Sequence, residues 1–196
     1  MRLQRRGATA ERHGGAGAIL PPWERVASQT RATQSADNVT DPDRSALMSY
    51  RIGPWTISPL PGWLDITDTV EDDDPAFTLA KEDGVGALQF SSAEYESGER
   101  PAPTPADLAE MVREFGESHD LGPPLDCRPA PGTSPAGASA NFHVDEDLVR
   151  VWYLAEGGHF LLVTYMCEQA DRGLELDEAE AIVRGVRLTA GRRQTA

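Results

Sequence analysis

The chain has 196 residues, a hydrophobic content of 39% and a formal net charge of -14. This length allows one domain of ordinary size plus an extension, and the hydrophobic content is normal for a globular protein. The negative charge and the single lysine, Lys81, argue against a nucleic-acid or acidic-membrane partner, because phosphate binding needs clustered cationic side chains.

The first 47 residues differ in composition from the rest. Residues 1–47 hold seven Arg against five acidic residues, a net charge of +2, which leaves -16 for residues 48–196. They are rich in Gly, Ala, Thr, Ser and Gln and show no sustained period, so we predict a disordered leader. Two interpretations stay open: a genuine disordered tail, or translation that begins at Met48, where a strand pattern starts.

Neither a signal peptide nor a membrane helix is indicated. The N-terminal arginines are not followed by an apolar run, and no stretch approaches the roughly 20 apolar residues of a membrane span. We therefore expect a soluble, cytoplasmic protein. Cys127 and Cys167 could pair only if their Cα atoms came within roughly 7 Å, and unpaired thiols are the ordinary state in a reducing cytosol.

The segment after the leader is rich in β-strand patterns. Strand faces are expected within residues 50–57, interrupted by Pro54, and again within residues 63–70. Residues 77–80 and 87–90 then form a hairpin.

The clearest local signal is a helix start. Thr104 is a typical N-cap, Pro105 suits the first helical position, and Asp107 lies three residues after the cap. A single apolar stripe follows at spacings of three and four: Leu108, Met111, Val112 and Phe115.

The C-terminal third predicts a meander closed by a second helix. Residues 119–137 are rich in Pro, Gly and Ala and indicate a crossover loop. After it, apolar residues recur at every second position, as in strands with one buried face. These are Phe142, Val144, Val149, Val151, Tyr153, Phe160, Leu162, Thr164 and Met166. A helix is expected from near Leu174 to about Val186.

Together these elements predict an α+β fold, a mostly antiparallel sheet flanked by two main helices in an α/β/α sandwich. We expect this domain over residues 48–190 and a frayed tail over 191–196. Four apolar side chains should pack on the one sheet: Leu108, Phe115, Ile182 and Val186.

Two acidic clusters are the candidate partner-binding residues. The first is Glu71, Asp72, Asp73 and Asp74, and the second is Asp145, Glu146 and Asp147. Both are expected on turns, from which side chains project. A cation site is disfavoured because calcium loops space their carboxylates at alternate positions. We predict no metal and no cofactor.

No catalytic motif is present. The four histidines, His13, His119, His143 and His159, lack the spacing of a metal pair, and Ser134 lacks the second glycine of a nucleophile elbow. A hydrolase would need distant residues, such as His143 with Asp145, or His159 with a serine. The aromatic residues Trp55, Trp63, Trp152 and Tyr153 favour a core role over a ligand platform.

The order of elements resembles the PsbP-like α/β/α sandwich. The local matches are Leu60-Pro61-Gly62-Trp63, the pair Trp152-Tyr153 followed by residues 160–165, and residues 178–184. Gly185 stands where the family usually has Ser. The resemblance implies a non-enzymatic, protein-binding domain, since members include a photosystem extrinsic subunit, a nuclear-import factor that binds a small GTPase, and bacterial proteins of unknown role, some of which look like immunity proteins that neutralise toxin partners. These motifs are structural, so no functional residue is carried over.

The first hypothesis is therefore a cytoplasmic immunity or accessory protein that engages a basic protein partner. The alternative is a small-molecule or lipid carrier with a pocket near Trp63, Phe90 and Trp152. A hydrolase with a dispersed site comes third.

Overall fold

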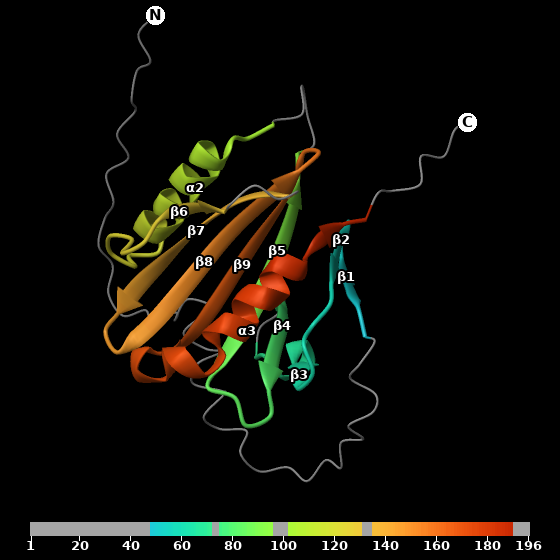
Figure 1. Cartoon of the computed structure of the whole chain (residues 1–196), viewed down its shortest axis with the longest axis vertical. Helices are drawn as coiled ribbons and strands as arrows, with labels where there is room; N and C mark the ends of the chain where they lie inside the picture. Colours follow the sequence, from blue (N-terminus) through green and yellow to red (C-terminus); the bar gives the residue numbers. More distant parts are fainter. Residues whose placement is uncertain (1–47, 72–74, 96–101, 131–134, 190–196) are drawn as a thin grey trace, which may run out of the picture.

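Figure 1 shows the computed structural model of the chain. It describes residues 48–71, 75–95, 102–130 and 135–189. The predicted leader and the predicted frayed tail both lie outside these residues.

The centre of the molecule is a seven-stranded antiparallel sheet. In spatial order its strands are β3 (Trp63–Asp65), β4 (Phe77–Lys81), β5 (Gly86–Glu94), β9 (His159–Glu168), β8 (Asp147–Glu156), β7 (Ala136–Val144) and β6 (Arg128–Ala130). A smaller sheet contains β1 (Tyr50–Ile52), β2 (Trp55–Ile57) and β10 (Arg187–Leu188). The helices are α2 (Pro105–Ser118) and α3 (Arg172–Gly185), with short 3-10 turns η2 (Thr67–Thr69) and η3 (Gln169–Asp171).

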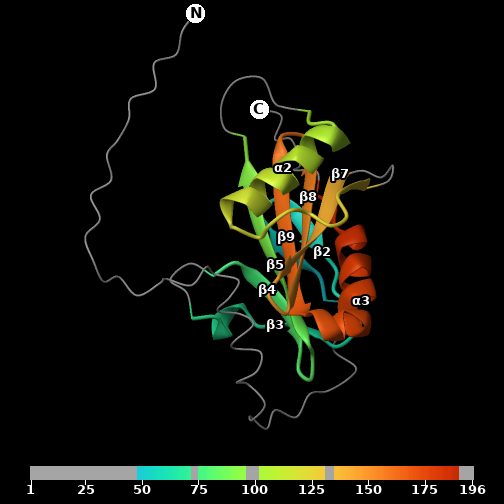
Figure 2. The same cartoon turned by 90° about the vertical axis from the view of Figure 1, so that its left-hand side faces the viewer.

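The helices lie on opposite faces of the large sheet (Figures 1 and 2). Helix α2 packs on β6, β7 and β8, and its Leu108 and Val112 enter one core. Helix α3 contacts β9 and β2, and its Ile182 enters a second core, which also contains Trp55 of the small sheet. The predicted α+β fold and α/β/α sandwich are confirmed.

The expectation of strands with one buried face is wrong for β8 and β9. In β9 the alternate residues Leu161, Val163 and Tyr165 are fully buried, whereas Phe160 and Leu162 are half-buried. The reason is that each central strand has a hydrophobic core on both of its faces, because α2 covers one and α3 the other. Burial on both faces removes the simple alternation of apolar and polar residues.

Helix α2 begins as the sequence predicted. The Thr104 hydroxyl accepts from the Asp107 N–H, and the Asp107 carboxylate accepts from the Thr104 N–H at 2.8 Å, which completes a capping box. Its buried face is formed by Leu108, Ala109, Val112 and Gly116. Met111 and Phe115, expected inside, are half-buried at its margin.

Two other expectations need correction. Thr67–Thr69 form the turn η2 instead of extending β3, because the Asp65 carboxylate accepts from the N–H and the hydroxyl of Thr67. Part of the predicted crossover loop is strand β6, which pairs with β7. The predicted second helix is confirmed to within two residues, since α3 begins at Arg172 and ends at Gly185.

Candidate protein-binding surface

Several acidic side chains gather at one end of the large sheet. Strand register places the start of β5 and the start of β8 beside the last residues of β9, with Gly86 and Leu148 both opposite Cys167. The β4–β5 turn, the β7–β8 turn and the connection from β9 to α3 therefore share this end, at the bottom of Figure 1. These connections carry Glu82, Asp83, Asp145, Glu146 and Asp171, which we call the acidic end.

Backbone geometry makes these side chains project. Glu82, Asp83, Asp145 and Glu146 are exposed, and Asp171 is half-buried. Asp145 has φ 54, a left-handed conformation that Asp tolerates better than most residues. The Gln169 N–H donates to the Glu146 carbonyl at 2.8 Å, which joins the β7–β8 turn to the start of η3.

The base of helix α3 is anchored beside this end by two carboxylates. Glu175 is 5% exposed and accepts from the Gly86 N–H at 3.2 Å. Glu178 accepts from Lys81 Nζ at 2.7 Å and from Trp63 Nε1 at 2.9 Å, and these bonds lower the pKa of its carboxyl, the lysine first. The anchors hold the carboxylates of α3 in fixed positions relative to the β4–β5 turn.

Of the first predicted acidic cluster the structure describes Glu71 alone, which lies apart from the second cluster. Asp145 and Glu146 belong to the acidic end, and Asp147 begins β8 there, half-buried and directly opposite Glu168. Glu71 is exposed but follows η2, on the side of β3, and β5 and β9 separate β4 from β8. Asp72, Asp73 and Asp74 lie outside the described residues.

Sequence reasoning missed the contribution of Glu82, Asp83 and Asp171. In the sequence, Glu82 and Asp83 fall between the two predicted strands of the hairpin, a position that indicates a turn and no binding role. Their proximity to Asp145 depends on the register of β5, β9 and β8, three strands that are distant in sequence. Adjacent turn signals alone carry no such information.

The three histidines in the described part of the chain lie at different places in the fold. His143 is exposed on β7, while His119 stacks on Phe115 at the end of α2, with ring centroids 4.1 Å apart. His159 lies at the other end of the sheet, with Nδ1 3.7 Å from Glu94 Oε1. Among the described residues, no group of three His, Cys, Asp or Glu side chains could hold a metal ion.

The aromatic residues proposed to line a pocket are part of the core. Trp63, Phe90 and Trp152 are 2%, 1% and 5% exposed and belong to the core beneath α3. Trp55 is buried in the same core. The expected core role is confirmed for Trp55, Trp63 and Trp152, whereas Tyr153 is half-buried against the core beneath α2.

The two cysteines are free and face different cores. Cys167 is buried in the core beneath α3, where burial raises the pKa of its thiol to about 11. Cys127 packs against the core beneath α2. The sheet separates the two thiols, which explains why they do not pair.

No helix in the described part of the chain has the length and hydropathy needed to cross a membrane.

The arrangement of two helices on opposite faces of this antiparallel sheet is the PsbP-like fold. The solution structure of cyanobacterial PsbP (CyanoP) from Synechocystis sp. PCC 6803 superposes with a TM-score of 0.53 at 10% identity, covering 79% of this chain and 97% of that chain. A crystal structure from Bacteroides thetaiotaomicron VPI-5482 has a TM-score of 0.46 at 12% identity and covers 69% of this chain and 45% of that chain, a likeness too low to carry an argument. No protein-family model and no curated protein matches the sequence. The similarity therefore defines the architecture alone.

Proposed function

We propose that this chain is a non-enzymatic protein-binding module, and that its acidic end engages a basic partner. The observation that carries the proposal is the convergence of carboxylates from three connections at one end of the sheet, of which Glu82, Asp83, Asp145 and Glu146 are exposed. The net charge of -14 acts in the same direction, since a field of one sign accelerates encounter with a partner of opposite charge.

The finer role that we propose is a cytoplasmic immunity or accessory protein. Free Cys127 and Cys167 suit a reducing compartment, although they do not require one. An immunity protein typically neutralises its partner by covering it, and a rigid acidic surface suits a basic partner.

The direct test is affinity capture from native lysate at low salt with a triple variant of the acidic end. The variant combines Glu82→Gln, Asp145→Asn and Glu146→Gln, which remove charge while retaining side-chain size. The wild type should retain a stoichiometric partner, and the variant should lose most of it. Capture should weaken as salt is raised, because exposed charges are screened beyond a Debye length of about 8 Å at physiological ionic strength.

A matched control is available on α2 and at its end. Glu114→Gln, Glu117→Gln and Asp120→Asn remove the same number of charges from exposed positions, and Asp120 has φ 55, like Asp145. This control should retain the partner. If both triple variants lost the partner equally, net charge and not the acidic end would explain the binding. Failure to recover any stoichiometric partner with the wild type would count against a protein-binding role.

A further inference from the structure

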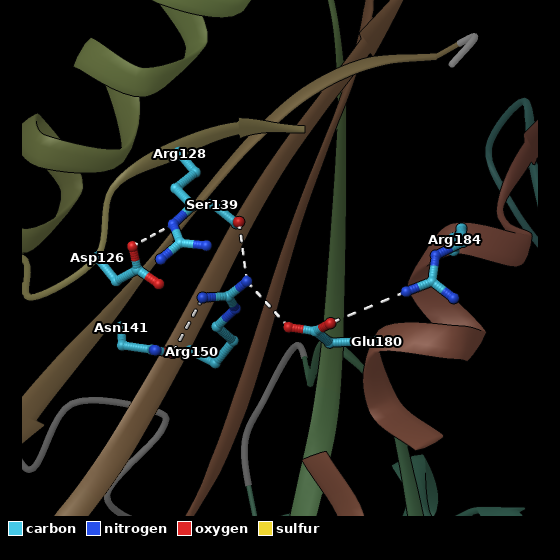
Figure 3. Close-up of polar contacts among 7 residues, drawn as sticks. All are labelled: Asp126, Arg128, Ser139, Asn141, Arg150, Glu180 and Arg184. Carbon is cyan, nitrogen blue, oxygen red and sulfur yellow. Dashed lines mark hydrogen bonds and ion pairs between the residues drawn. The ribbon is translucent and has the colours of Figure 1, made fainter. Parts of the chain in front are cut away.

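A second polar cluster lies on the opposite side of α3 from its Lys81 anchor, over β7 and β8 (Figure 3). Strand register places Asn141 opposite Arg150 and Ser139 opposite Trp152, so these side chains share the face of the sheet that carries α3. The other face of the same strands packs under α2 with Ala140, Phe142 and Val151. Polar side chains thus occupy the part of the α3 face that flanks the helix.

Arg150 is the centre of this cluster. Its side chain is only 12% exposed, and it lies over the Trp152 ring at 5.3 Å. Nη1 donates to Asn141 Oδ1 at 3.2 Å, and Nη2 donates to Ser139 Oγ at 3.0 Å and to Glu180 Oε1 at 3.0 Å. Arg150 Nε is buried and has no hydrogen-bond partner in the described part of the chain.

The guanidinium of Arg150 is therefore fixed in place and incompletely compensated. Burial lowers its pKa from the ordinary value, and the Glu180 carboxylate opposes that shift. A positive charge held away from water, with one carboxylate and two neutral side chains as its partners, interacts strongly with a nearby anion.

Glu180 already occupies the position of an anion between two arginines. Its second oxygen lies 3.9 Å from Arg184 Nη2, and Figure 3 shows the carboxylate between the guanidinium groups of Arg150 and Arg184. Glu180 is 34% exposed and Arg184 is 70% exposed, so solvent reaches this position from the helix side. The nearby Arg128 is 75% exposed and adds positive potential at Arg150.

The concentration of cations here is unusual for this chain. The described residues contain eight Lys and Arg side chains against 22 Asp and Glu, and three of the eight are Arg128, Arg150 and Arg184. Within the cluster these three face only two carboxylates, Asp126 and Glu180. The local balance is one positive charge in a molecule that is otherwise strongly negative.

We propose that this cluster is a binding site for a small oxyanion, a phosphate or carboxylate group, which replaces the Glu180 carboxylate between Arg150 and Arg184. Arg150 supplies the Nη2 donor that now contacts Glu180, a charge-assisted donor of the kind that binds oxyanions, and the Arg184 guanidinium lies on the helix side of the bound group. Glu180 acts as an internal competitor that fills the position when no ligand is bound. This site is separate from the acidic end and does not depend on a protein partner.

The test is a titration of the full chain with inorganic phosphate, followed by amide chemical shifts at constant ionic strength, with succinate as the carboxylate probe. Glu180→Gln should bind the probe about threefold to tenfold more tightly than wild type, because the competing charge is removed while the side-chain oxygen remains. Arg184→Gln should weaken binding by a similar factor. The stronger of the two probes identifies the preferred group.

The matched controls come from the Arg113–Glu110 pair on α2, on the opposite face of the sheet. Glu110→Gln and Arg113→Gln change the same charges and should leave binding unchanged. Shifts that also appear with chloride, an absence of saturation in Glu180→Gln, or equal effects of the two pairs of variants would overturn the proposal. Arg184 is exposed, so its variant keeps the test valid even if a change at Glu180 alters folding.

Discussion

The carboxylate of Glu178 is the clearest residue whose environment is set by the tertiary fold. One oxygen accepts from both Lys81 and Trp63, side chains that come from β4 and β3. From the sequence alone, a glutamate on the solvent side of a helix is expected to be hydrated and to have no fixed partner. The paired donors instead favour its charged form, and a favoured charged form couples folding to pH.

We expect this coupling to appear in the pH dependence of the free energy of unfolding. Because the pKa of Glu178 is lowered in the folded state, its stabilisation is complete above the ordinary value of 4.5 and is lost as the pH falls below it. The carboxylate is 39% exposed, so the effect should stay below about 1 kcal/mol. Urea unfolding of wild type and Glu178→Gln should differ most above about pH 5 and converge near about pH 3. A constant difference across this range would contradict the prediction.

Arg150 shows how a single residue can signal a site that the sequence pattern hides. It shares its strand face with Leu148, Trp152 and Leu154, which are all buried. A lone arginine at a core-facing position requires partners, because burying an unpaired charge is costly. The sequence shows that Arg150 needs hydrogen-bond or ion-pair partners, but only the fold shows that these partners are Ser139, Asn141 and Glu180.

At the scale of elements, α2 shows local signals and tertiary packing acting together. Its start is fixed by a capping box within four residues, Thr104 to Asp107. Its packing on β7 depends on the absence of a side chain at Gly116, because an added Cβ would collide with the Phe142 ring. The first feature is visible in sequence, whereas the second depends on how closely the helix approaches the sheet.

The cap makes a direct prediction for Thr104→Ala. Loss of the side-chain acceptor leaves the Asp107 N–H without its partner, and the free energy of unfolding should fall by about 1 kcal/mol. Thr104→Ser keeps the hydroxyl and should stay close to wild type. Chemical denaturation measures both, and equal stability of the alanine and serine variants would show that the cap does not contribute.

The close approach of Gly116 to Phe142 predicts that alanine at position 116 lowers the free energy of unfolding, whereas helix propensity alone would predict that it raises it. Gly116→Ala should destabilise the protein by about 1 to 3 kcal/mol, because the methyl group collides with Phe142 although alanine is the better helix former. Gly173 in α3 is the matched control, since an added Cβ meets nothing within 4 Å. Gly173→Ala should be neutral or stabilising by up to about 1 kcal/mol. Stabilisation by both alanines would contradict the packing of α2 on β7.

At the scale of the whole molecule, charge and architecture act separately. The chain carries a net charge of -14, and in the described part of the chain every Asp and Glu side chain except Glu175 is exposed or half-buried. Like charges on a compact body repel one another, and this repulsion opposes folding without altering the fold.

Screening should therefore stabilise the protein. Raising sodium chloride from about 0.02 M to about 0.3 M shortens the Debye length from roughly 20 Å to roughly 6 Å and should raise the midpoint of thermal unfolding by a few degrees. Differential scanning calorimetry measures this shift. A midpoint that falls with salt would mean that attractive ion pairs such as Lys81–Glu178 outweigh the repulsion.

The sequence by itself determined the class of fold, the start of α2, the hairpin from β4 to β5 and the acidic composition. These features follow from local rules: capping, alternation, turn chemistry and composition, each of which acts over a few residues. The PsbP-like resemblance was carried by such structural motifs, which is why it indicated architecture and no functional residue.

Only the tertiary structure decided which residues meet. The burial of β8 and β9 on both faces follows from two helices that dock on opposite sides of one sheet. The acidic end depends on strand register between β5, β9 and β8, and the Arg150 cluster depends on α3 docking on the sheet so that Glu180 reaches Arg150 of β8. Each is a contact between segments far apart in the chain, and the free energy that selects such contacts comes from burying both cores at once, which no local pattern encodes.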